Sequence, residues 1–222
     1  MQVSLDDTPY TSFTCADDAS KKNIRASELH ILQSPSYTPS GEDAYYNPNT
    51  RISKPEAYRL LLSFLPPYSR LSVNQRRAYA RLHEAWSIPS VDTTPDLYIK
   101  IFNDLDSVLF GGKLYKRVLL HWSDSLPAYS AGRCSPPDPE AGRPRVRIQL
   151  DRRMFLHQVK AFVWGTLVHE MMHAFLMVVS WEAREQFSSS SGHEHGEMFR
   201  YAADRLAEML HFDRFSGRDV IS

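Results

Sequence analysis

The sequence predicts an α+β fold, in which a short antiparallel sheet of three strands packs on one central helix, with further helices around it. The order of the patterns is the first observation: helical segments come first, three strand-like segments follow, and two helical segments come last. Residues 145–150 then alternate between apolar and polar side chains, which indicates a half-buried strand. The helical pattern that follows is apolar nearly all round, which indicates a buried helix.

The first half of the chain divides at two points. Residues 1–53 are rich in Ser, Thr, Pro, Asp and Asn and show no sustained hydrophobic period, so we expect them to be largely disordered. Residues 54–93 form a predicted helical extension, with one helix over 54–65 that stops at Pro66-Pro67 and a second over 72–88. The main domain is expected over 94–222, because Thr94 and Pro95 are favoured residues at the start of a helix.

The second half supplies the sheet and the remaining helices. Strands are predicted at 117–122, 129–134 and 145–150, and a loop rich in proline and glycine separates the last two. A helix is expected over 157–179. A serine-rich loop at 188–191 then leads into a final helix that reaches Leu210.

Composition limits the classes of protein that fit. A chain of 222 residues with 42% hydrophobic residues can bury one sizeable core. Its most apolar stretch is interrupted by charged and imidazole side chains, so we expect no membrane partner, and we expect a monomer. The acidic N-terminus has no apolar signal region, and Cys15 and Cys134 are too few for a disulfide framework, so a reducing compartment and no secretion are expected.

The motif His169-Glu170-Met171-Met172-His173 carries the chemistry. Residues four apart on a helix lie one above the other, so His169 and His173 can bind a single Zn²⁺. Glu170 can then reach a water at that metal and act as the general base, as in zinc peptidases. The alternative is a core helix whose histidines bond to neighbouring groups, but burying two imidazoles and a carboxylate without partners is costly.

A catalytic zinc needs a third protein ligand and an open position. The metzincin pattern is excluded, because Leu176 and Val179 stand where it requires Gly and His. Spacing alone does not choose among the candidates that open the final helix, which are His193, Glu194, His195 and Glu197. Tyr129 and Tyr201 are candidates to stabilise the oxyanion, although a tyrosine near a core more often packs there.

Residues 95–212 resemble the SprT-like family of zinc metalloproteases, whose best-known animal member cleaves DNA–protein crosslinks. The matching pieces follow the family's order and lie at 109–114, 121–123, 131–134, 145–150, 166–174 and 195–199. The resemblance implies a zincin-like domain over 94–222, a Zn²⁺ cofactor held by His169, His173 and His195, and Glu170 as the catalytic residue. Two residues inserted before Gly196, relative to the usual Gly-His-Gly, keep His193 open as the alternative ligand.

The chain carries no net charge, yet residues 113–153 hold nine basic side chains against four acidic ones. If these basic side chains form one face of the sheet beside a zinc cleft, that face could bind the DNA backbone. The alternative is that they form a strand face exposed to solvent. With the resemblance, we expect single-stranded or junction-containing DNA as a partner and nuclear or cytoplasmic residence. The candidate DNA-binding residues are Arg143, Arg145, Arg147, Arg152 and Arg153.

Three functions therefore remain open. The first is a DNA-associated zinc endopeptidase that cleaves proteins bound or crosslinked to DNA. The second is a zinc peptidase that cleaves free proteins without nucleic acid. The third is a non-enzymatic zinc-bearing domain that binds DNA or a partner, against which Glu170 argues, because a structural zinc site needs no base.

Overall fold

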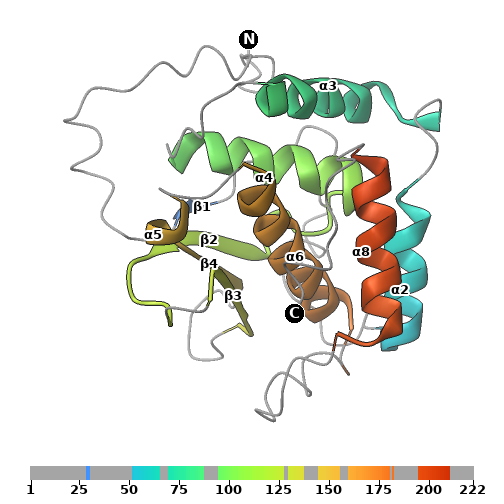
Figure 1. Cartoon of the computed structure of the whole chain (residues 1–222). Helices are drawn as coiled ribbons and strands as arrows, with labels where there is room; N and C mark the ends of the chain where they lie inside the picture. The colour runs from blue at the N-terminus through green and yellow to red at the C-terminus, as the bar shows by residue number, and fades with distance from the viewer. Residues whose placement is uncertain are drawn as a thin grey trace.

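The computed structural model combines several helices with a small mixed sheet that lies at one side of them, which confirms the predicted α+β class (Figure 1). The structure describes residues 29–30, 52–65, 70–87, 95–127, 130–137, 145–155, 160–180, 182 and 195–210. The strands are β1 (Leu29–His30), β2 (Val118–Ser123), β3 (Gly132–Ser135) and β4 (Val146–Asp151). The helices are α2 (Lys54–Ser63), α3 (Val73–Ser87), α4 (Pro95–Leu109), α5 (Arg152–Phe155), α6 (Lys160–Val179) and α8 (Glu197–Met209).

The strands pair in the order β1-β2-β4-β3. The outer pairs are antiparallel, but β2 and β4 are parallel, with Val118 opposite Val146. The predicted antiparallel sheet of three strands is therefore wrong in its topology. The reason is that β3, which lies between β2 and β4 in sequence, pairs on the far side of β4, so the chain enters β2 and β4 in the same direction. Alternation assigns residues to faces of a sheet and says nothing about which strands are neighbours.

Strand β1 lies inside the segment that the sequence predicts to be disordered. Leu29 pairs with Leu120 and His30 with Leu119, which adds a short edge strand that the sequence did not predict. Two residues are too few to show a hydrophobic period, so the sequence pattern could not predict a strand there. Ile52 and Ser53 are described too, and the rest of that segment lies outside the described residues.

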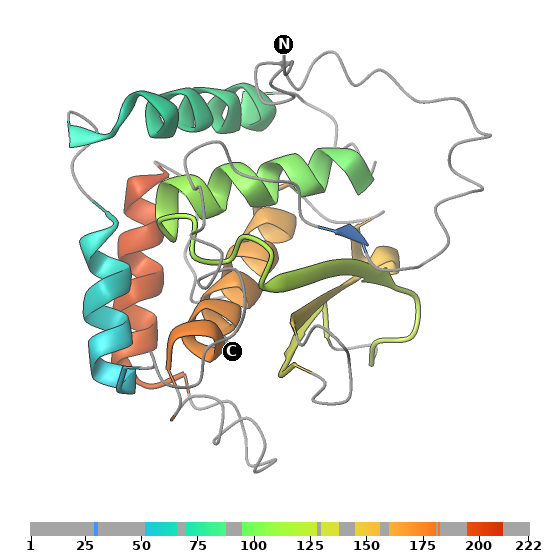
Figure 2. The ribbon, with the colours of Figure 1, turned by 180° about the vertical axis from the view of Figure 1, so that it is seen from behind.

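Helix α6 forms the centre of the molecule. It lies between the sheet and the pair α2 and α8, and both views show this arrangement (Figures 1 and 2). By length and a mean hydropathy of 1.4 it could cross a membrane, but 89% of its most apolar window is buried inside the protein. That burial is typical of a core helix, as its apolar residues on every side predict.

Helices α2 and α3 contribute to the same hydrophobic core as α4, α6 and α8. Ser53 and Glu56 form a capping box at the start of α2, and the Glu182 carboxylate accepts a 2.9 Å hydrogen bond from the Lys54 amide. On α3, the Arg81 guanidinium binds both carboxylate oxygens of Asp104 on α4. Helix α6, which carries His169 and His173, is therefore held in a core to which helices on several sides of it contribute.

Asp106 organises the turn that joins α4 to β2. Its Oδ1 accepts a 3.1 Å hydrogen bond from the Leu114 amide, while Gly111 and Gly112 supply positive φ angles of 62° and 71°. The Asp106 carboxyl is fully buried, and Oδ2 has no hydrogen-bond partner among the residues that the structure describes. Burial raises the pKa of Asp106 to about 7, despite hydrogen bonds from the Leu114 and Tyr115 amides.

Replacing Asp106 by Asn is expected to flatten the pH dependence of stability. The folded pKa lies above the unfolded value, so the folded state binds more protons between about pH 4 and pH 7, and stability falls as pH rises through that window. Asn keeps the Oδ1 acceptor and cannot ionise. Between about pH 5 and pH 8, the melting temperature of the natural chain should fall roughly 5 °C more than that of Asp106→Asn. Equal slopes would show that Asp106 does not titrate in this range.

Candidate metal centre

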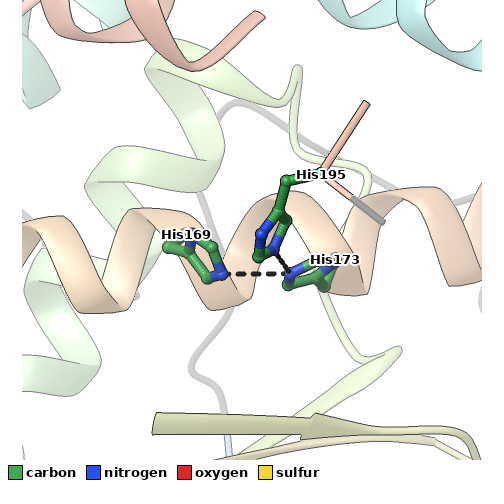
Figure 3. Close-up of side chains that lie close together, drawn as sticks. All are labelled: His169, His173 and His195. Carbon is green, nitrogen blue, oxygen red and sulfur yellow. Dashed lines mark hydrogen bonds between the residues drawn. The ribbon is translucent and has the colours of Figure 1, made fainter. Parts of the chain in front are cut away.

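Three histidine side chains meet at one point on α6. His169 and His173 project from adjacent turns of this helix, and His195 reaches them from the segment just before α8 (Figure 3). The Nε2 atom of His173 lies 3.1 Å from Nε2 of His169 and 3.1 Å from Nε2 of His195. One nitrogen of each ring lies within 4.8 Å of the other two, so the three could hold a metal ion.

The geometry of these nitrogens fits a tetrahedral metal. Zinc–nitrogen bonds of about 2.0–2.1 Å place two ligand nitrogens of a tetrahedron roughly 3.3 Å apart, close to the 3.1 Å separations here. Imidazole is a favoured ligand of zinc, copper, iron and nickel, so the donor set alone does not select the metal. A neutral imidazole has only one N–H to donate, so three ring nitrogens that face one another cannot all be paired by hydrogen bonds among themselves. A bound cation would serve as the shared partner of all three.

Phe199 supports all three imidazoles. Its ring lies 4.8 Å from the His173 ring at an angle of 27°, 4.7 Å from the His195 ring and 5.3 Å from the His169 ring. Phe199 is on the first turn of α8 and only 2% exposed. It therefore fixes the orientations of the rings through packing, and it ties the position of α8 to that of α6.

Glu170 follows His169 on α6, and its side chain lies on the side of the helix that meets β3. The side chain is packed against Gly132 and accepts a hydrogen bond from the backbone N–H of Cys134. Glu170 is 7% exposed. Burial raises the pKa of its carboxyl to about 8, and the Cys134 hydrogen bond partly opposes this rise. A cation held nearby favours the ionised form of such a carboxyl.

The other candidate ligands do not join the cluster. Glu197 is exposed on the first turn of α8, and His193 and Glu194 lie outside the described residues. Tyr129 also lies outside them, and Tyr201 is 58% exposed on α8. Among the described candidates, His195 is therefore the one that the structure brings to His169 and His173.

The described part of the chain includes four of the five candidate DNA-binding arginines, which are Arg145, Arg147, Arg152 and Arg153. On β4 the apolar residues Val146, Ile148 and Leu150 belong to the core against α6, so Arg147 points to the opposite face of the sheet. Arg145 precedes that strand and is partly buried, and Arg143 lies outside the described residues.

Two further arginines engage acidic side chains of the chain itself. Arg153 binds the Asp151 carboxylate and donates a 2.6 Å hydrogen bond to the Leu126 carbonyl. Arg152 lies 3.6 Å from the Asp124 carboxylate, and both side chains are exposed. The structure therefore places Arg147 on the sheet face away from α6 and pairs Arg152 and Arg153 with acidic side chains of the chain itself, and the DNA-binding role of these residues stays a prediction.

Residue patterns did not reveal the surroundings of the site. Phe199 stands four residues after His195, a spacing that places both residues on one side of the start of α8. That spacing was the local signal that could have indicated the contact of Phe199 with the histidine cluster. Gly132, Cys134 and Thr166 meet Glu170 through contacts between distant segments. No local signal in the sequence predicts contacts of that kind.

Comparison with known proteins adds one finding to this geometry. The model of the SprT-like family matches residues 98–216, which is more than half of the chain and includes the histidines and Glu170. No individual curated protein matches the chain.

Proposed function

This chain belongs to the SprT-like family, and from that premise we propose that it is a zinc-dependent endopeptidase that cleaves proteins bound or crosslinked to DNA. The family is associated with metallopeptidase activity. The observation that carries the proposal is the meeting of three imidazole nitrogens at α6, the helix that also carries the buried carboxyl of Glu170.

Each residue has a defined task in this proposal. His169, His173 and His195 hold the metal through their ring nitrogens. A zinc ion bound there supplies water activation and polarisation of the scissile carbonyl. Glu170 accepts the proton of the attacking water and returns it to the leaving amine. Phe199 keeps the imidazoles in orientation through the ring contacts described above.

A catalytic role fits this donor set better than a structural one. Structural zinc sites use four protein ligands, whereas catalytic sites use three and leave one position for water or substrate. Within the described ranges, three histidines gather, and no fourth Cys, His, Asp or Glu joins the group. Burying the Glu170 carboxyl is energetically unfavourable, and a purely structural zinc site would give no reason to keep a carboxyl there.

The choice of DNA-bound substrates rests on the sequence. Residues 113–153 carry an excess of basic side chains, and the SprT-like family includes a protease of DNA–protein crosslinks. The family alone is the reason for proposing residence in the nucleus, and residence in the cytoplasm is the alternative. The second candidate is a zinc peptidase that cleaves free proteins, and the position of Arg147 on the sheet face away from α6 favours it.

Cleavage of a basic DNA-binding protein, with and without single-stranded DNA, separates these candidates. The zinc-loaded chain should cleave it only when DNA is present, and Glu170→Gln should not cleave it in either case. Equal cleavage in both conditions would contradict the DNA part of the proposal and favour the second candidate. Bound zinc without any cleavage would favour the non-enzymatic domain.

A further inference from the structure

We propose that Gly132 on β3 is a positioning residue for Glu170, because its missing side chain leaves the space that the Glu170 carboxyl occupies. The proposal rests on the proposed function and concerns the same site. It assigns to β3 a role in placing the general base, in addition to its place in the sheet.

The space at Gly132 is filled by two residues of α6. A Cβ atom built on Gly132 would lie 2.8 Å from Thr166 Cγ2, 2.9 Å from Glu170 Cγ and 2.9 Å from Glu170 Oε1. Real Cβ atoms essentially never approach heavy atoms closer than 3.0 Å. Any side chain at position 132 must therefore displace one of these neighbours.

Backbone conformation does not explain the glycine. Among the described residues, the glycines with positive φ are Gly111 and Gly112, and Gly132 is not one of them. An alanine can therefore adopt the backbone of residue 132 without strain. The requirement at this position is space for the two side chains of α6.

Thr166 and the β3 backbone have little freedom to move. The Thr166 hydroxyl donates a 2.9 Å hydrogen bond to the Phe162 carbonyl, which fixes the rotamer that points its methyl group at Gly132. Gly132 pairs with Leu150 across the sheet, and its carbonyl accepts a 2.7 Å hydrogen bond from the Ser130 hydroxyl. The longer and more flexible side chain of Glu170 is then the one that shifts.

Strand β3 also supplies the hydrogen bond that holds Glu170 in place. It is the edge strand beside β4, and the Cys134 amide donates to the Glu170 carboxyl. A methyl group at position 132 would push Oε1 away from this position. Displacing a catalytic group by about 1 Å costs roughly 100-fold in rate, because a general base must stay within hydrogen-bond reach of its proton.

Gly132→Ala is therefore expected to lower kcat about 100-fold, while KM and bound zinc stay close to their natural values. The added methyl meets Thr166 and Glu170 most closely, and the metal-binding histidines are not among its nearest contacts. Gly196→Ala is the matched control, because a Cβ there meets no described residue within 4 Å although Gly196 adjoins His195. This control should keep kcat within about twofold.

A second variant separates positioning from folding. Gly132→Ala/Thr166→Ser removes the methyl that lies 2.8 Å from the new Cβ, so kcat should recover by about tenfold over Gly132→Ala alone. Zinc content and melting temperature would be measured for each purified variant. The kinetic constants kcat and KM would be measured with a basic protein substrate in the presence of single-stranded DNA.

Three results would overturn the proposal. Unchanged kcat in Gly132→Ala would show that Glu170 needs no space there. Loss of zinc or of folding in Gly132→Ala without recovery in the double variant would show a purely structural role. If the natural chain shows no cleavage that depends on Glu170, the proposed function itself fails and the positioning role falls with it.

Discussion

Replacing Glu170 by Gln is expected to lower peptide cleavage by about 1000-fold and to leave the bound metal in place. Gln has almost the shape of Glu, so it can fill the same buried space beside Gly132 and accept the Cys134 hydrogen bond through its carbonyl oxygen. It cannot take a proton from water. Turnover should therefore fail, while the three histidines keep their arrangement.

The measurement is kcat with zinc content determined on the same preparation. Glu197→Gln is the matched control, because Glu197 is exposed two residues from His195 and was itself a candidate ligand. Natural values of both quantities in this control would remove Glu197 from the site. Substantial cleavage by Glu170→Gln would mean that another group acts as the base.

Replacing His173 by Ala is expected to remove both the metal and the activity. The Nε2 atom of His173 lies 3.1 Å from Nε2 of each of the other two histidines, and the residue is only 4% exposed. Its loss leaves two ligands, and zinc affinity should fall by more than about 100-fold, because even changes to groups that merely orient ligands cost up to that much.

Zinc affinity measured by competition with a chelator tests this expectation. His83→Ala provides the control, since His83 is an exposed histidine of α3 outside the cluster. It should bind zinc as tightly as the natural chain. Retention of tight binding by His173→Ala would show that the metal, if any, is held elsewhere.

The central helix and two of its ligands could be predicted from the sequence because both depend on local periodicity. The apolar residues on every side of α6 indicate its burial, and the spacing of four residues places His169 and His173 on one face. The alternation in β4 also predicts correctly which side chains enter the core. These features need no knowledge of distant segments.

The remaining features depend on contacts between distant segments. Local patterns left four candidates for the third ligand, and only the path of the chain before α8 brings His195 to α6. The parallel pairing of β2 with β4 and the packing of Glu170 against Gly132 are of the same kind. Alternation places Arg147 on one face of β4, but the face that meets the candidate metal centre follows from the packing of α6.

Removal and return of zinc test the central claim most directly. Cleavage of a basic DNA-binding protein in the presence of single-stranded DNA would be measured before chelation, after chelation and after adding about one zinc ion per chain. Cleavage should disappear on chelation and return with zinc in the natural chain, but not in Glu170→Gln. Cleavage that persists after the metal has been removed would contradict the account.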